Sequence, residues 1–236
     1  MHRSQTLLWL SVSITLCACS LPATQNLIPE DKSGSGTATL KEVPVLDQQE
    51  ILEKLDGAIL NESDDIQFLQ TGVLEIGEAN ADTTLTVFTE YHCAYCNEFH
   101  RDFVPRLQED FMRDGSFKIR FVPFVINKYP NSADAIKGFI CAGKMGKGLK
   151  MHKLLTERQN KHRSSAIAYA KELQIDDAVF SKCLDSEDVQ SLLDTQKSIA
   201  DELDITRAPT FFLNSEKKMG LPYYPDIRGW IRQNIK

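Results

Sequence analysis

Two cysteines, Cys93 and Cys96, restrict this chain most strongly, because they stand where a predicted strand meets a predicted helix. Residues 84–89 alternate in polarity and are rich in β-branched and aromatic side chains, which is typical of a strand. Residues 97–113 repeat large apolar side chains every four positions, which predicts a helix, kinked at its internal proline. Residues 117–124 predict a second strand, so the cysteines lie in a strand–helix–strand unit with two parallel strands.

The position of this cysteine pair predicts redox chemistry. Two sulfurs at this spacing can close a small disulfide ring, and the unpaired N–H groups at the start of a helix stabilise a thiolate. A cysteine pair between a strand and a helix is therefore typical of thiol–disulfide exchange. We expect Cys93, the first and more exposed, to be the attacking thiolate and Cys96 to resolve the mixed disulfide.

Zinc binding and an inert structural disulfide are the alternatives for this pair. Zinc takes four ligands, commonly as two close pairs, whereas Cys141 and Cys183 stand far apart in the sequence. An inert bridge is less consistent with the position, because the start of a helix favours the thiolate and so destabilises the oxidised form. We therefore predict no metal and no organic cofactor.

A proline stands directly before a third predicted strand, residues 210–213, although proline removes a hydrogen-bond donor from a strand ladder. A cis bond between Ala208 and Pro209 explains this placement and leaves the Ala208 backbone free to bind an extended substrate segment. A trans proline that simply begins the strand is the alternative. Beside the cysteine pair we favour the cis bond, and we predict that Ala208, Pro209 and Tyr95 bind substrate.

The first eighteen residues have the pattern of an export signal, with a basic start and an apolar run over residues 6–16. The tetrad that ends in Ala18 and Cys19 resembles the bacterial lipobox, in which cleavage precedes a cysteine that is then lipidated. An ordinary secretory signal with a chance cysteine is the alternative. We expect an exported lipoprotein, anchored through Cys19 on the periplasmic or extracytoplasmic side of a membrane. Ser20 weakly indicates the outer membrane.

Two further predictions concern single residues. Glu90 precedes Cys93 by three positions and is a candidate proton carrier for Cys96, with a solvated surface acid as the alternative. Cys141 and Cys183 are either two buried thiols or a structural disulfide, and an oxidising compartment favours the disulfide.

Composition and periodicity divide the chain into successive parts. The formal charge of −6, from 33 acidic and 27 basic residues, argues against a nucleic-acid partner. The predicted parts are a signal at 1–18, a flexible tether at 19–40, a helical extension at 41–72, the first part of an α/β domain at 73–130, an inserted helical block at 131–203 and the second part of the α/β domain at 204–236. The extension contains a predicted helix over 45–60, which packs on the domain or forms a homodimer; residues 214–218 predict a turn and 226–235 the last helix.

Several stretches together resemble one family. The cysteine segment 88–96, the helical insertion, residues 180–186 and residues 208–214 are similar to the DsbA-like branch of the thioredoxin superfamily, over about residues 73–235. The resemblance implies an α/β thioredoxin fold with an inserted helical domain. It also implies that the protein exchanges disulfides with cysteine-containing exported proteins and is reset by a membrane redox partner.

Carried over to this chain, the resemblance makes Cys93 the nucleophile, Cys96 the resolving thiol and Pro209 the cis-proline. The dipeptide Ala94-Tyr95 differs from the Pro-His of the strongest oxidases in this branch, which predicts a less oxidising disulfide. Oxidase and isomerase activity both stay open. A non-catalytic chaperone or adaptor that binds unfolded chains is the alternative function.

Overall fold

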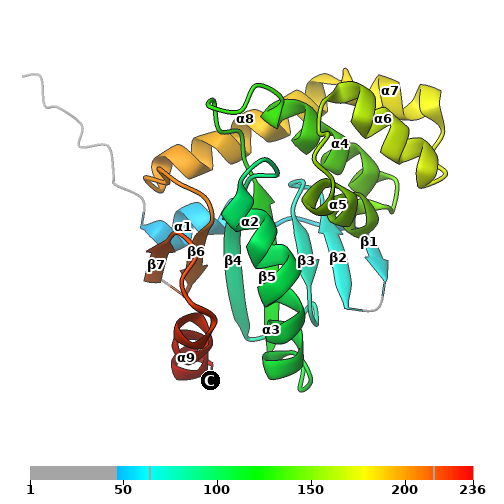
Figure 1. The fold of residues 1–236 in the computed structure, drawn as a ribbon. Helices are drawn as coiled ribbons and strands as arrows, with labels where there is room; N and C mark the ends of the chain where they lie inside the picture. Colours follow the sequence, from blue (N-terminus) through cyan, green and yellow to red (C-terminus); the bar gives the residue numbers. More distant parts are fainter. Residues whose placement is uncertain (1–46, 64, 215, 236) are drawn as a thin grey trace, which may run out of the picture. The chain divides into compact units, whose positions relative to one another are not determined.

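A seven-stranded mixed sheet organises the described part of the chain (Figure 1). The computed structural model describes residues 47–63, 65–214 and 216–235. The strands are β1 (Ile59–Ser63), β2 (Ile66–Leu69), β3 (Leu74–Ile76), β4 (Thr83–Thr89), β5 (Phe117–Pro123), β6 (Thr210–Leu213) and β7 (Glu216–Met219), in the spatial order β1-β2-β3-β5-β4-β6-β7. β4 and β5 are parallel and the other neighbouring strands antiparallel, so the predicted α/β class and the parallel pair are confirmed.

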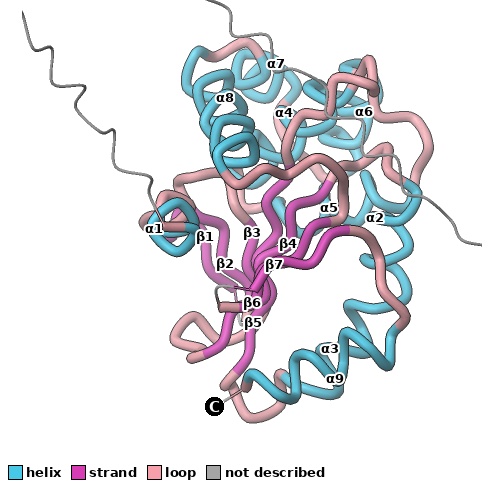
Figure 2. The backbone as a smooth tube through the Cα atoms, turned by 90° about the vertical axis from the view of Figure 1, so that its left-hand side faces the viewer, coloured by secondary structure: helices cyan, strands magenta, loops and turns pink. Residues whose placement is uncertain are grey.

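Side chains that alternate along the central strands build two separate apolar layers, as the strand period requires. Val87 and Phe121 face one layer, while their neighbours Phe88 and Val122 face the other. Helices therefore cover both faces of the sheet (Figure 2). The first layer is covered by α2 (Ala94–Glu98), a π-helical segment (Phe99–Phe103), α3 (Val104–Phe111) and α9 (Tyr224–Asn234); the second by α1 (Gln48–Glu53) and the end of α8 (Glu187–Glu202).

The predicted helical block lies over the end of the sheet where β4 and β5 finish (Figure 1). Besides α8 it contains α4 (Ser132–Lys144), α5 (Gly148–Glu157), α6 (Arg163–Glu172) and α7 (Asp177–Leu184). α4 and α5 are separated at Gly146, which has a φ of +71°, a conformation that favours glycine. The block thus stands next to the end of β4 that leads into the cysteine pair.

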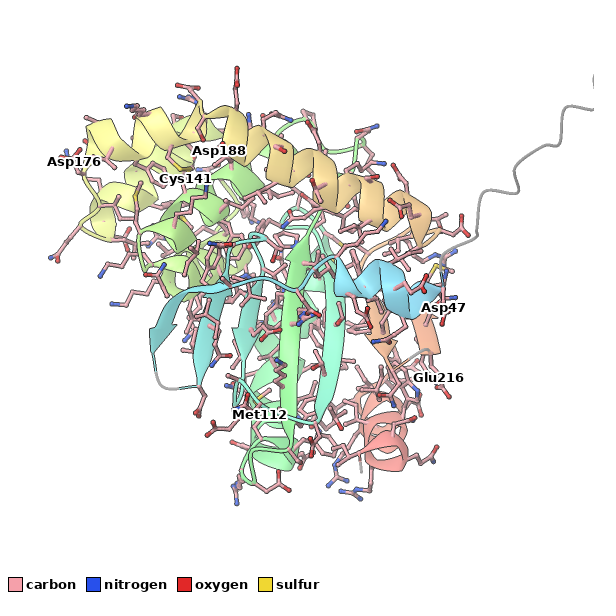
Figure 3. All side chains as sticks on the ribbon, turned by 180° about the vertical axis from the view of Figure 1, so that it is seen from behind. Asp47, Met112, Cys141, Asp176, Asp188 and Glu216 are labelled. Carbon is pink, nitrogen blue, oxygen red and sulfur yellow. A yellow bond between two sulfur atoms is a disulfide. The ribbon has the colours of Figure 1, made fainter. Side chains whose placement is uncertain are left out.

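Cys141 of α4 and Cys183 of α7 form a disulfide with an S–S distance of 2.09 Å and a Cα–Cα distance of 5.9 Å. Cys141, labelled in Figure 3, is fully buried in the core of the block. The bridge joins two helices that also contact each other, and it closes a loop with a sequence separation of 42.

Removing this bridge is expected to destabilise the protein without stopping its thiol chemistry. On the chain-entropy model, a loop of this length contributes about 4 kcal/mol, and measured losses for native bridges run from about 2 kcal/mol upward. Urea unfolding of the Cys141→Ala, Cys183→Ala variant should therefore show a lower midpoint, with a slope that does not fall, because the denatured chain without the bridge is less compact. An unchanged midpoint would contradict a stabilising role for the bridge.

Two sequence predictions are wrong at the edges of the sheet. The helix expected over residues 45–60 ends at Glu53, and residues 59–63 form β1 instead. Apolar residues at helical spacing suggested one helix, but Gly57 interrupts it and packs against Thr71, with only 3.1 Å from its would-be Cβ to Thr71 Cγ2. Within residues 47–63 and 65–72 the predicted extension is therefore helical only over Gln48–Glu53, since β1 and β2 extend the sheet.

The apolar residues of α1 are buried within their own chain, against the second layer of the core. Of the two alternatives for this helix, packing on its own domain accounts for these buried side chains. The turn predicted at 214–218 is also too long, because β7 begins at Glu216. Glu216, Lys217 and Lys218 lie on this edge strand, where charged side chains are common.

The long helix predicted after the cysteines is interrupted as expected. α2 gives way to the π-helical segment, and α3 resumes at Val104 with Pro105 in its first turn. Proline has no N–H to continue the helical ladder, so the hydrogen-bond pattern changes just before it.

Three predictions fall outside the described residues: the signal at 1–18, the tether at 19–40 and lipidation at Cys19. Among the helices that are described, none combines the length and apolar character needed to cross a membrane.

Candidate active site

Cys93 and Cys96 lie at the junction of β4 and α2, close to the helical block. Cys93 is the N-cap residue of α2, with extended backbone angles, and Cys96 falls in the first turn of the helix. Both are present as thiols; Cys93 is 7% exposed and Cys96 fully buried. Cys93 is thus the sulfur that another molecule reaches first, although it is less open than the sequence indicated.

The pKa of Cys93 is lowered from its ordinary value of 9.0 to about 6. A hydrogen bond from the Cys96 side chain contributes most, and the backbone N–H groups of Cys96 and Tyr95 lower the pKa further. Burial and the charge of Glu90 act in the opposite direction. At neutral pH Cys93 is therefore mostly a thiolate and thus a nucleophile.

The pKa of Cys96 is raised well above 9.0, first by burial and then by the proton that Cys96 shares with Cys93. A hydrogen bond from the Thr89 hydroxyl lowers the pKa of Cys96, but it offsets only part of this increase. The two sulfurs are therefore pushed toward opposite protonation states, an attacking thiolate and a thiol that keeps its proton.

Ala208 and Pro209 face Cys93, although 115 residues separate Ala208 from that cysteine. The Ala208–Pro209 peptide bond is cis, and the Cys93 thiol lies 3.3 Å from the Ala208 carbonyl oxygen, which accepts its hydrogen bond. Pro209 is buried and uses its own carbonyl to accept from the Gly220 N–H, whereas Ala208 is half-buried. Of the predicted substrate-binding residues, Tyr95 is 63% exposed and the backbone of Ala208 lies beside the reacting sulfur.

Glu90 is buried, so its interpretation as a solvated surface acid is wrong. Its carboxylate accepts a hydrogen bond from the His92 backbone N–H at 2.6 Å and contacts His92 Nδ1 at 3.0 Å. The imidazole of His92 also stacks on Tyr129, with 5.7 Å between the ring centroids. The carboxylate is thus fixed near the sulfurs, and its charge raises the pKa of Cys93.

Lys161 is a buried cation beside the cysteines that sequence patterns did not reveal. It donates to the Tyr91 carbonyl, and burial lowers its pKa, against the charges of Glu90 and the two cysteines. Lys161 belongs to the loop between α5 and α6, 70 residues from Tyr91, and no local motif marks it. Only the fold brings it to the site.

The side chains around Cys93 and Cys96 offer few ligands for a metal ion. Cys141 and Cys183 are bonded to each other and so cannot complete a zinc site with Cys93 and Cys96. In residues 47–63, 65–214 and 216–235, no group of three potential ligand side chains converges.

Alkylation of the reduced protein with iodoacetamide is expected to show the lowered pKa of Cys93 directly. Because only the thiolate reacts, the rate should rise with pH through a midpoint near 6 and then level off. The ultraviolet absorbance of the thiolate should follow the same curve. A midpoint near the ordinary value of 9.0 would contradict the stabilised thiolate.

Glu90→Gln is the companion variant for that titration. It removes a negative charge whose effect is to raise the pKa of Cys93, so the midpoint should move to lower pH. A midpoint that moves upward would mean that Glu90 acts mainly by holding the loop in place.

The sequence of this chain is similar to that of known proteins. The family model described as Thioredoxin matches residues 70–233. This chain belongs to the thioredoxin family. Disulfide bond formation protein D of Bacillus subtilis is 22% identical over 169 residues, which are 68% of this chain and 76% of that protein.

Solved structures share the fold of this thioredoxin-family protein, including its helical block. Oxidised BdbD from Bacillus subtilis has a TM-score of 0.63 at 22% identity, over 76% of this chain and 99% of that one. The catalytic domain of Proteus mirabilis ScsC also has a TM-score of 0.63, at 17% identity, over 80% of this chain and 99% of that one. Chlamydia trachomatis DsbA has a TM-score of 0.57 at 19% identity, over 67% of this chain and 89% of that one. The predicted fold, DsbA-like with an inserted helical domain, is confirmed.

Proposed function

We propose that this protein is a thiol–disulfide oxidoreductase that forms or isomerises disulfides in exported proteins. The observation that carries the proposal is a Cys93 thiol of pKa about 6, one helical turn from a buried Cys96 that keeps its proton. A relative with the printed name disulfide bond formation protein supports the same activity.

The reaction uses only the two cysteines and the thiols of the client protein. A client thiolate attacks the Cys93 sulfur of the Cys93–Cys96 disulfide; a client–Cys93 disulfide forms, and Cys96 leaves with the electron pair and takes up a proton. The second client thiolate then attacks the client sulfur of this mixed disulfide and releases Cys93 as a thiolate. The client has lost two electrons, which reduced Cys93 and Cys96 hold until a membrane redox partner removes them. In isomerisation, reduced Cys93 instead attacks an incorrect client bridge.

The stabilised Cys93 thiolate sets the direction of this exchange. A low pKa makes Cys93 a good leaving group and stabilises the reduced form, which favours transfer of the disulfide to clients. The Ala208 backbone beside Cys93 and the exposed ring of Tyr95 provide a surface for an extended client segment. Glu90, buried beside the sulfurs, stays a predicted proton carrier.

A trapping experiment tests this function. In the Cys96→Ala variant Cys93 can still attack a client disulfide, but the thiol of this chain that would resolve the mixed disulfide is missing, so adducts between Cys93 and client proteins should accumulate and disappear on treatment with dithiothreitol. The Cys93→Ala, Cys96→Ala double variant is the matched control and should trap nothing. If Cys96→Ala also traps nothing, a chaperone or adaptor that only binds chains becomes the better explanation.

Membrane anchoring forms a separate part of the proposal and rests on the lipobox-like sequence before Cys19. The full chain should sediment with bacterial membranes, and Cys19→Ala should release it or leave its signal uncut. A Cys19→Ala protein that is processed and fractionates like the parent chain would contradict a lipid anchor.

A further inference from the structure

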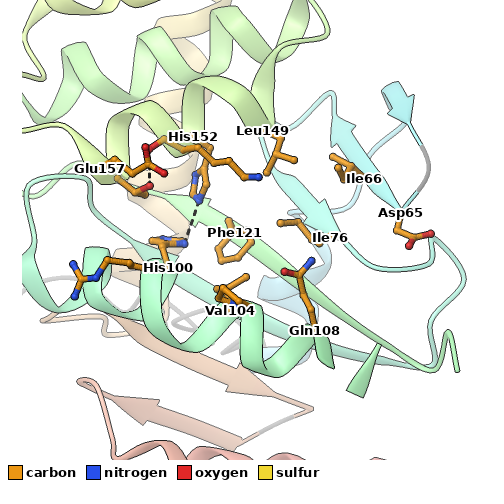
Figure 4. Close-up of a pocket in the computed structure, with 14 residues that line it drawn as sticks. Asp65, Ile66, Ile76, His100, Val104, Gln108, Phe121, Leu149, His152 and Glu157 are labelled. Carbon is orange, nitrogen blue, oxygen red and sulfur yellow. Dashed lines mark hydrogen bonds between the residues drawn. The ribbon is translucent and has the colours of Figure 1, made fainter. Parts of the chain in front are cut away.

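A chain of buried polar groups leads away from Cys96 on the first layer of the core. The Thr89 hydroxyl lowers the pKa of Cys96 as a donor to its thiolate does, and the same hydroxyl lies 3.0 Å from His100 Nε2. His100 Nδ1 lies 3.1 Å from His152 Nε2, and His152 Nδ1 lies 3.0 Å from the Tyr91 hydroxyl. Figure 4 shows the two rings facing each other between the π-helical segment and α5.

Counting donors and acceptors gives this chain one direction in the reduced protein. A neutral imidazole has one N–H and one acceptor nitrogen, and each hydroxyl donates once. If Thr89 donates to Cys96, it must accept from His100 Nε2. His100 Nδ1 then accepts from His152, and His152 Nδ1 accepts from Tyr91. Every donor therefore points toward the sulfur, and all four ring nitrogens have partners.

Both rings are neutral at physiological pH, so the chain holds no buried charge at rest. Burial lowers the pKa of His152 to about 3, with a smaller effect from Lys153. Burial and the neighbouring His152 likewise lower the pKa of His100 well below 6.5, while burial and Glu90 raise that of Tyr91. Tyr91 thus keeps its proton, and the imidazoles can pass protons without holding them.

The histidine pair also borders a cavity of about 550 Å³ between α3, α5 and the sheet. His152 is buried, but His100 is partly exposed. Side chains exposed to solvent complete the wall, so the cavity opens to water. The charged groups that line this cavity are Arg101, Lys153, Glu157 and, at the end away from the pair, Asp65.

We propose that Thr89 and His100 carry protons between the solvent in this cavity and Cys96, with His152 and Tyr91 holding His100 in position. The inference rests on the proposed function, because Cys96 changes protonation only when disulfides are exchanged. The proposal gives Cys96 a proton path that does not use Glu90, because the carboxylate of Glu90 is hydrogen-bonded to His92.

The step is balanced as follows. The client thiolate forms a bond to the Cys93 sulfur, the Cys93–Cys96 bond breaks, and Cys96 leaves as a thiolate. Thr89 gives its hydroxyl proton to Cys96 and receives one from His100 Nε2, while His100 Nδ1 takes up a proton from water in the cavity in place of its hydrogen bond from His152, so that the ring stays neutral as its other tautomer. In the reverse direction, when Cys96 attacks a mixed disulfide, its proton leaves by the same groups after their donor directions reverse.

Two-phase oxidation by dithiobisnitrobenzoate tests this path in the full chain. Cys93 attacks first and releases one coloured thiolate; Cys96 then gives up its proton, closes the disulfide and releases the second. In His100→Ala the second phase should slow by about tenfold or more, as for loss of a proton-transfer group, while the first phase changes less than about twofold. His162→Ala, which replaces an imidazole bonded to Ser164 and Ser165, should change neither phase.

Chemical rescue separates proton transfer from a structural role. Imidazole can enter the cavity enlarged by His100→Ala and should restore the second phase, whereas N-methylimidazole, which lacks the ring N–H, should not. Equal rescue by both compounds, rescue by neither, or an unchanged second phase would overturn the proposal. So would a slower second phase in Glu90→Gln but not in His100→Ala.

A second variant and a separate assay complete the test. If His100→Ala does not fold, Thr89→Val tests the same path, because it removes the hydroxyl next to Cys96. This variant should slow the second phase alone. Equal slowing of both phases would overturn the proposed path. Parent protein that shows both phases but oxidises no reduced peptide would contradict the proposed function and leave the proton path standing.

Discussion

Replacing Cys93 with alanine is expected to abolish disulfide exchange, with a loss of at least about a thousandfold in the rate of oxidation of a reduced dithiol peptide. The reason is that every bond made to a client is made at this sulfur. Cys96 cannot substitute for it, because Cys96 is fully buried and its raised pKa keeps it a thiol. Oxidation of the peptide by catalytic amounts of protein, with oxidised glutathione as the terminal oxidant, measures the loss.

The fold should survive this change, since Cys93 is a helix-cap residue with its side chain at the edge of the core. Circular dichroism and the urea midpoint of the reduced proteins provide the check. The Cys141→Ala, Cys183→Ala variant is the control, since it removes two sulfurs outside the site and should keep its exchange rate. Disulfide exchange that persists in Cys93→Ala would show that a different sulfur reacts with the client.

Replacing Glu75 with leucine is expected to destabilise the protein by about 3–5 kcal/mol, the usual cost of leaving a buried charge without its partner. Glu75 of β3 binds two cations of β5: its carboxylate lies 2.9 Å from Lys118 Nζ and 2.6 Å from Arg120 Nε. Less than an eighth of each of these three side chains is exposed, with values of 4%, 11% and 12%. Arg120 keeps a partner in Asp56, whereas Lys118 keeps only the Ala79 carbonyl.

Urea unfolding measures the effect, and two variants interpret it. Glu172→Leu removes the exposed partner of Arg158 and should cost far less, because water screens that pair. Glu75→Leu combined with Lys118→Met should recover part of the loss, since no buried ammonium group is then left unpaired. A loss for Glu75→Leu no greater than for Glu172→Leu would show that water reaches the buried pair.

The reacting sulfurs and the surrounding elements of the fold were predictable because their signals are local. A strand period followed by a helix period located β4 and α2, and the cysteine spacing placed both sulfurs in one helical turn. Pro209 was also recognisable, since a proline conflicts with the strand that follows it. The expected disulfide partners, Cys141 and Cys183, came from cysteine counting and the expected compartment.

The first sheet strands were missed because their signals are weak and not local. Residues 59–63 have no clear alternation, and their conformation depends on pairing with β2 at the edge of the sheet. The helical spacing of Ile51, Leu52 and Leu55 was real, but it extends for less than two turns before Gly57.

By itself, the sequence determined the α/β class, the redox-active pair and the order of the elements, because each depends on neighbours within about ten positions. The tertiary structure alone decided the surroundings of the sulfurs. Lys161 and His152 come from segments far from the cysteines in the chain, whereas Glu90 and His100 stand close to them in sequence but gave no local sign of their surroundings. Burial removes the water that would otherwise solvate charge, so the carboxylate of Glu90, which would be ordinary on a surface, raises the pKa of Cys93 here.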